Sequence, residues 1–207
     1  MATHIVLLGY GHWLPNDLRG SHSETVHIPQ VAELGPLHKG RKIVQPPASE
    51  LREFHRQAEE ALRHTVHWFS LEDRDAIRDA FARIHKEHRL TSYACAILPN
   101  HVHILVRRHA LQGHRIHDLL KQHAAEAVRH NANLSAEHPV FSAGRGTQYK
   151  FTPAEVYSCA RYIANNFAKH KLPYERYEFV KEYDGWNIGR NGTGRGPQCP
   201  RDASDYW

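Results

Sequence analysis

Residues 91–108 read TSYACAILPNHVHILVRR and contain two runs rich in Tyr, Ile, Leu and Val. A Pro-Asn pair, typical of turns, separates the two runs. Strand-forming residues on both sides of a turn predict either a β-hairpin or a single strand with a tight break. Because side chains alternate between the two faces of a strand, His101 and His103 share one face while Val102 lies on the other.

His101 and His103 form the only His-x-His pair in the sequence. Two imidazoles side by side on a rigid strand can both offer a ring nitrogen to one divalent metal ion. Histidine makes up 19 of 207 residues, so chance placement alone gives about 1.7 His-x-His pairs. The pair therefore indicates a metal site only because it lies on a predicted strand. The alternative is two partly buried histidines whose nitrogens bond to neighbouring groups.

Strands and helices alternate along the rest of the chain, which predicts an α+β fold with one sheet. Further strands are expected at 1–10 and 139–151, and helices at 49–65, at 114–130, at 153–171 and in a segment that starts at Ser70. Residues 11–49 are rich in Gly and Pro and predict a long loop or insertion with a functional or mobile role.

The last expected helix carries Tyr162 and Asn166, which are four residues apart and therefore share a face. Thr152 as N-cap and Glu155 as its capping-box partner mark the start of this helix. A carboxamide oxygen is a reasonable third ligand for a hard cation, and a tyrosine on the same face would lie close to that ion. A cation that neutralises a phosphate makes attack by a phenol on phosphorus feasible. The alternative is a tyrosine that belongs to the core.

Two motifs together, ILPNHVHILV at 97–106 and RYIANN at 161–166, resemble the single-tyrosine HUH transposases. The group most similar is the REP-associated tyrosine transposases and their insertion-sequence relatives. GYGHWLPNDLRGS at 9–21, FTPAEV and YDGWN also look like segments of these proteins, so the resemblance covers residues 1–190. The chain departs from the pattern at Phe167, where many members have Pro, and in its long segment 20–47.

The resemblance implies a ferredoxin-like single antiparallel sheet with helices packed on it, of the HUH endonuclease type. It implies that Tyr162 cleaves and rejoins single-stranded or hairpin DNA through a 5′-phosphotyrosine. His101, His103 and Asn166 would bind Mg²⁺ or Mn²⁺. The chain would act as a monomer or homodimer in the bacterial cytoplasm, associated with the nucleoid. A domesticated relative that binds DNA without cutting it and a zinc-binding hydrolase are the alternative functions.

The charge balance favours a phosphate-rich partner, since 27 Lys and Arg against 22 Asp and Glu give a formal charge of +5. Arg107 and Arg108 leave the end of the histidine strand and are expected to follow a DNA backbone, with solvated surface charge as the alternative. Tyr10 and Trp13 are expected to stack on unpaired bases, with packing of the loop as the alternative. The second expected basic cluster is Lys39, Arg41 and Lys42.

Length and composition predict one catalytic domain at 1–183, interrupted by the insertion at about 15–48, and a flexible Gly/Arg/Pro-rich tail at 184–207. A hydrophobic fraction of 41% allows an ordinary core. The three cysteines, odd in number and without paired spacing, indicate a reducing compartment. No run of about 18 apolar residues occurs, so no membrane span is expected.

Overall fold

The computed structural model describes residues 1–21, 29–40 and 42–185. Most of the tail predicted at 184–207 therefore lies outside the described residues. The elements are β1 (Ala2–Leu8), α1 (Pro29–Ala32), α2 (Ala48–Ala61), α3 (Leu71–His88), β2 (Ser92–Ile97), β3 (His101–Arg107), α4 (Gly113–Asn131), β4 (Gly146–Lys150) and α5 (Pro153–Lys169).

The four strands form one open antiparallel sheet in the order β2-β3-β1-β4. β2 and β3 are the two arms of the predicted hairpin, and Ile97 lies opposite Val102 next to its turn. β1 pairs with the other side of β3, where Val6 lies opposite His103. The prediction of an α+β fold with a single antiparallel sheet and helices packed on it is confirmed.

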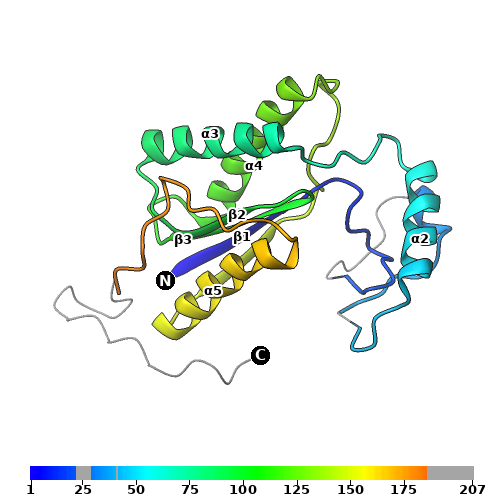
Figure 1. Cartoon of the computed structure of the whole chain (residues 1–207), viewed down its shortest axis with the longest axis horizontal. Coiled ribbons are helices and arrows are strands. Elements are labelled where there is room, and N and C mark those ends of the chain that lie inside the picture. The colour runs from blue at the N-terminus through cyan, green and yellow to red at the C-terminus, as the bar shows by residue number, and fades with distance from the viewer. Residues whose placement is uncertain (22–28, 41, 186–207) are drawn as a thin grey trace.

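The helices cover both faces of the sheet, with α3 and α4 on one side and α5 on the other (Figure 1). Val102, Ile104 and Val106 are fully buried on the face of β3 that α3 and α4 cover. The side chains that alternate with them, His101 and His103, therefore lie on the α5 face. This arrangement puts the histidine pair of a central strand beneath the helix that carries Tyr162.

The start of α5 is fixed by the predicted capping box. The Thr152 hydroxyl accepts a hydrogen bond from the Glu155 backbone N–H at 3.2 Å, and the Glu155 carboxylate accepts one from the Thr152 N–H at 2.8 Å. Pro153 occupies the first turn, where its missing N–H has no cost. The helix ends at Lys169, two residues before the predicted position.

The described part of the insertion is mostly irregular, with one short helix. This part contains α1 and packs with α2 around a second hydrophobic cluster, beside the main body of the molecule (Figure 1). That cluster consists of the buried residues Leu14, Val31, Phe54, Ala58 and Leu62. The insertion and α2 thus form a small lobe, named here the α2 lobe, with apolar contacts of its own.

The helices of the described residues are all too short or too polar to cross a lipid bilayer.

Replacing Thr152 by Ala removes the oxygen that caps α5, so we expect the free energy of unfolding to fall by about 1 kcal/mol. Urea denaturation followed by circular dichroism measures the change. Thr152→Ser keeps the hydroxyl and should retain most of the stability. Equal losses in the two variants would show that the cap contributes little.

Candidate histidine–tyrosine site

His101 and His103 face each other through their Nε2 atoms, which lie 3.1 Å apart. The two rings are nearly perpendicular, at 89°. His103 is buried, and His101 is partly exposed where β3 begins. Alternation along β3 places both rings on one face, and backbone hydrogen bonds to β1 and β2 on its two sides hold the strand rigid.

The spacing of the two nitrogens fits a shared divalent cation. Two ligands at right angles, each about 2.1 Å from Mg²⁺ or Mn²⁺, are themselves about 3.0 Å apart. Within the described part of the chain, no group of three or more His, Cys, Asp or Glu side chains has the arrangement of a metal site. A complete site on this pair therefore needs a donor of another kind, such as a carboxamide, a water or a phosphate oxygen.

Each of the two imidazoles has a partner for its second nitrogen. His101 Nδ1 lies 2.7 Å from Asn100 Oδ1, which can only accept, so Nδ1 carries the proton and Nε2 keeps its lone pair. His103 Nδ1 lies 3.1 Å from Nε2 of the buried His4 on β1. A hydrogen bond at the far nitrogen orients a ligating histidine and sets its tautomer.

Burial keeps these imidazoles neutral at neutral pH, as metal ligation requires. Burial, followed by the nearby charges of His170 and His12, lowers the pKa of His101 to about 3. Burial and the neighbouring His101 and His4 lower the pKa of His103 well below its usual range. The pKa of His4 falls to about 4, again chiefly through burial.

Tyr162 lies against His103, the buried member of the pair. Its ring is edge-to-face with that of His103, with centroids 5.4 Å apart, and is 6.2 Å from the ring of His4. The Lys169 ammonium lies 4.7 Å from the centroid of the tyrosine ring. The ring of His170, which caps the end of α5, is 5.3 Å from that of His101. The structure thus brings together three of the four residues expected from the sequence.

Asn166 is one helical turn beyond Tyr162 and is buried, with 4% of its surface exposed. Its amide Nδ2 donates a hydrogen bond to the Tyr162 main-chain carbonyl at 2.7 Å. That bond holds the Asn166 side chain against α5 through its amide nitrogen. The bond does not involve the side-chain carbonyl oxygen.

Arg107 and Arg108 lie at the other end of β3 from His101. Arg107 is six positions after His101, which is roughly 20 Å along a strand. Arg107 Nη1 is 3.3 Å from the Asp184 carboxylate, and Arg108 is exposed. The structure does not bring these two arginines to the histidine pair.

The predicted DNA contacts of the insertion have different environments. Lys39 and Lys42 are exposed, whereas Arg41 lies outside the described residues. Tyr10 is partly buried, with its ring edge-to-face on those of His64 and His138, so it packs the α2 lobe against the body. Trp13 is 39% exposed, but the Arg19 guanidinium lies 3.9 Å from its ring centroid and occupies one face.

Sequence reasoning did not identify the residues that complete this site. They are His4, Asn100, Lys169 and His170, whose side chains contact the pair or Tyr162, and His12, whose charge adds to burial in lowering the pKa of His101. Asn100 had a local signal, because it directly precedes the histidine strand. His4 had one only through the β1–β3 register, which a single sequence does not specify.

No protein-family model matches the chain, and no curated protein matches it in sequence.

The buried imidazoles make stability depend on pH. In the unfolded chain a histidine binds a proton near pH 6.5, whereas folded His4 and His101 bind one only near pH 4 and pH 3. Below pH 6.5 the unfolded state therefore holds more protons, and stability that is present above pH 6.5 is lost as the pH falls. The loss at about pH 5 is about 2 kcal/mol for each buried imidazole.

Urea denaturation in EDTA at several pH values measures this slope. His4→Gln removes one of the groups and should flatten the curve, and His130→Gln on the exposed side of α4 is the matched control. If both variants flatten the curve equally, the buried imidazoles are not its source.

Proposed function

We propose that this chain is a DNA strand-cleaving and rejoining enzyme of the single-tyrosine HUH type, with Tyr162 as nucleophile and Mg²⁺ or Mn²⁺ held by His101 and His103. The observation that carries the proposal is the contact between the Tyr162 ring and His103, whose Nε2 faces that of His101 at 3.1 Å. The strand order β2-β3-β1-β4 with a βαββαβ alternation supports a ferredoxin-like, HUH-type fold.

The side chains of the site have separate tasks in this reaction. Asn100 and His4 hold the two ligating rings in orientation, and burial keeps both rings neutral. A bound divalent cation neutralises the charge of the phosphate and polarises its P–O bonds. Lys169, beside the tyrosine ring, adds positive charge where the phosphate would lie. Asn166 is the proposed third ligand, through the carbonyl oxygen that the helix bond does not use.

The chemistry is a transesterification that conserves the phosphodiester energy. The Tyr162 oxygen forms a bond to phosphorus, the bond from phosphorus to the 3′ oxygen breaks, and the phenol proton is lost as the 3′-hydroxyl gains one. A 3′-hydroxyl then attacks the phosphotyrosine and restores the phenol. No nucleotide cofactor is consumed. The substrate is single-stranded or hairpin DNA, and the formal charge of +5 is compatible with it.

Tyr162→Phe should abolish strand cleavage and leave DNA binding within about twofold, because only the attacking oxygen is lost. The assay incubates the protein with labelled single-stranded oligonucleotides and Mn²⁺, and detects a covalent adduct by denaturing gel and its position by mass spectrometry. Tyr157→Phe, on the same helix against Tyr183, is the matched control.

An adduct that persists in Tyr162→Phe would refute the role of this tyrosine. Metal-independent DNA binding with no adduct in the wild type would instead indicate the domesticated, non-catalytic relative.

Metal binding tests the histidines independently of cleavage. His103→Ala should abolish Mn²⁺ binding measured by calorimetry, and His4→Ala should weaken it by about 10- to 100-fold, because His4 orients the ligand through its second nitrogen. His130→Ala is the surface control. Tight, stoichiometric Zn²⁺ without any DNA cleavage would favour the zinc-binding alternative, and unchanged Mn²⁺ affinity in His103→Ala would contradict the proposed site.

A further inference from the structure

Trp68 presents a large apolar ring to solvent close to the histidine pair. It precedes α3, and 58% of its surface is exposed. The next residue, Phe69, is buried in the main core, and its N–H donates a hydrogen bond to the Pro99 carbonyl at 2.7 Å. Pro99 is two residues before His101. The exposed indole is therefore attached to a rigid anchor on the turn that leads into the histidine strand.

His12 fills the space between this indole and the turn. Its ring is edge-to-face with that of Trp68, with centroids 4.3 Å apart, and its Nε2 donates to the His67 carbonyl at 3.0 Å. A Cβ on Gly9 would lie 2.6 Å from His12 Cδ2 and 2.7 Å from the Asn100 carbonyl oxygen. The His12 ring and the Asn100 carbonyl therefore both lie next to Gly9. The His12 ring is thus between Trp68 and the Pro99-Asn100 turn.

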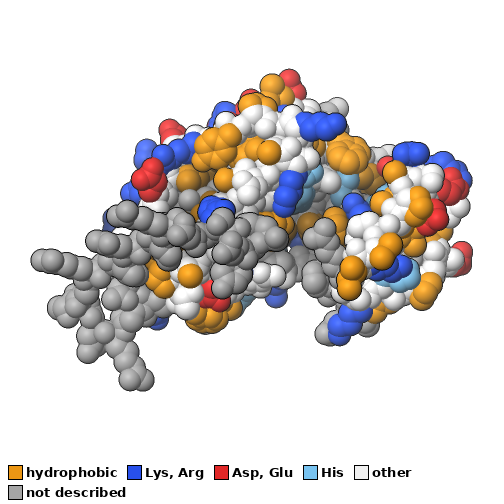
Figure 2. All heavy atoms as spheres, turned by 60° about the horizontal axis from the view of Figure 1, so that its bottom comes forward, with side chains coloured by type: hydrophobic (Ala, Val, Ile, Leu, Met, Phe, Trp, Pro, Cys, Tyr) orange, Lys and Arg blue, Asp and Glu red, His pale blue; other side chains and the backbone are white. Residues whose placement is uncertain are grey.

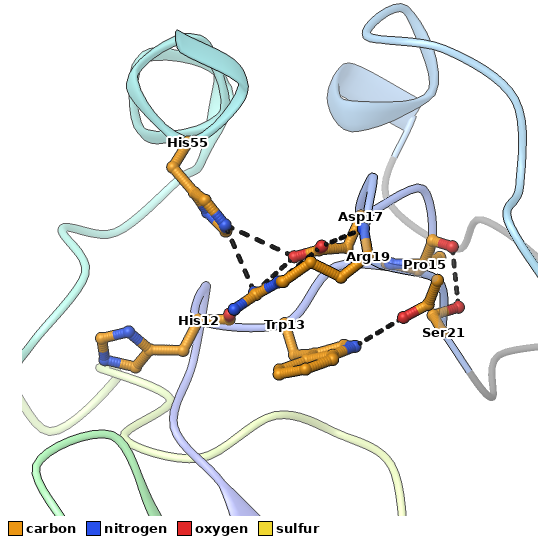
Figure 3. A network of polar contacts seen from close by, with 8 residues as sticks. His12, Trp13, Pro15, Asp17, Arg19, Ser21 and His55 are labelled. Atoms are coloured by element: carbon orange, nitrogen blue, oxygen red, sulfur yellow. Dashed lines mark hydrogen bonds and ion pairs between the residues drawn. The ribbon is translucent and has the colours of Figure 1, made fainter. Parts of the chain in front are cut away.

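The position of His12 is fixed by a polar network in the α2 lobe (Figure 3). The fully buried Asp17 carboxylate forms a two-point ion pair with Arg19, at 2.8 and 2.6 Å, and lies 3.4 Å from His55 Nε2 of α2. The same Arg19 donates from Nη2 to the His12 carbonyl at 3.1 Å. Burial raises the pKa of Asp17, but the hydrogen bonds from Arg19 and His55 outweigh it and lower that pKa overall.

Arg19 also distinguishes the two exposed tryptophans of this region. It occupies a face of Trp13, whose Nε1 donates to the Gly20 carbonyl at 3.0 Å, so Trp13 is part of the lobe's own structure. Trp68 makes only the edge contact with His12 among the ring contacts of the described residues. Of the two, Trp68 offers the more accessible π-face.

We propose that Trp68, supported by His12, is a stacking site for one unpaired base of the DNA strand that enters the histidine–tyrosine site. The inference rests on the proposed function and adds to it the group that holds the strand beside the cleaved phosphate. An indole face binds any base, because every base has a π-face, and cations track the phosphates. In Figure 2, histidine side chains reach the surface between the body and the α2 lobe, with Lys or Arg beside them.

The charge of the neighbouring site favours DNA over an apolar partner. The Lys169 ammonium lies 4.7 Å from the centroid of the Tyr162 ring. An exposed indole on the turn that leads into this site suits a ligand that is both aromatic and anionic, and unpaired DNA is such a ligand.

The test compares oligo(dT) with an abasic oligomer of the same length, which has the same phosphates and no bases. In a Tyr162→Phe background, to prevent cleavage, Trp68→Ala should lose about 5- to 150-fold in affinity for oligo(dT) and almost nothing for the abasic oligomer. Trp68→Phe should recover part of the loss. Phe151→Ala is the matched control, since it removes an aromatic residue, 59% exposed, at the opposite end of the sheet.

Intrinsic fluorescence gives a second readout. Oligo(dT) should quench the indole emission of the parent protein, and the quenched component should be missing in Trp68→Phe. Unchanged affinity in Trp68→Ala, or equal losses for the two oligomers, would overturn the inference. So would an equal loss in Phe151→Ala, or a change from dimer to monomer in Trp68→Ala with no change in DNA affinity.

These outcomes are separate from those of the proposed function. If the wild type forms an adduct on Tyr162 while Trp68→Ala binds oligo(dT) normally, only the stacking site is wrong. If no single-stranded DNA is bound or cut by any variant, both proposals are wrong. Circular dichroism of Trp68→Ala should match the parent protein, because the removed ring is exposed.

Discussion

The antiparallel pairing of β1 with β3 is the constraint on which the rest of the structure depends. Its register puts Val6 opposite His103 and Leu105 opposite His4, so the two histidines lie diagonally on one face. Diagonal neighbours across a strand pair are within reach of each other when their side chains are long, and here the two rings meet at 3.1 Å. A slip of one residue would turn His4 to the opposite face.

The same pairing makes β3 a central strand, with backbone hydrogen bonds on both sides. A central strand is the most rigid place in a sheet of this size, and ligating rings need a rigid support. The apolar side chains of β3 supply that rigidity on the face of α3 and α4, where Val102, Ile104 and Val106 are fully buried. One strand thus serves the core with one face and the site with the other.

The features that could be predicted from the sequence are those set by residues close together in the chain. Alternation along residues 101–107 gave the shared face of the histidine pair, and the Thr152–Glu155 capping box gave the start of α5 within one residue. The pairing of β1 with β3 joins residues about one hundred positions apart, and nothing in one sequence encodes that register. His4, which is brought to the pair only by this long-range contact, could not be found. His12 could not be found either, because it lies beside the Asn100 turn only through the hydrogen bond from Gly9 to the Asn100 carbonyl.

The packing of the insertion against α2 could not be predicted for a different reason. Gly and Pro predict turns in 11–49, and the few apolar residues among them, such as Leu14 and Val31, give no periodic pattern. They are buried because α2 packs against them. Likewise, the Asp17–Arg19–His55 network needs α2 in place before Asp17 can be buried. In the sequence, Asp17 and Arg19 look like charged residues of a solvated loop. Only their contacts with each other and with His55 of α2 show that they stabilise the fold.

The burial of the site imposes a balance between stability and function. Neutral, desolvated imidazoles are what a metal or a phosphate-bound cation needs, and they lower stability wherever the unfolded chain can take up protons. Two nearby cations, Lys169 and Lys150, oppose protonation of these rings, since, in addition to burial, Lys169 lowers the pKa of His103 and Lys150 lowers that of His4. The charges that act on His101 and His103 come from histidine and lysine side chains, so the proposed DNA phosphate would bring the opposite charge to the pair.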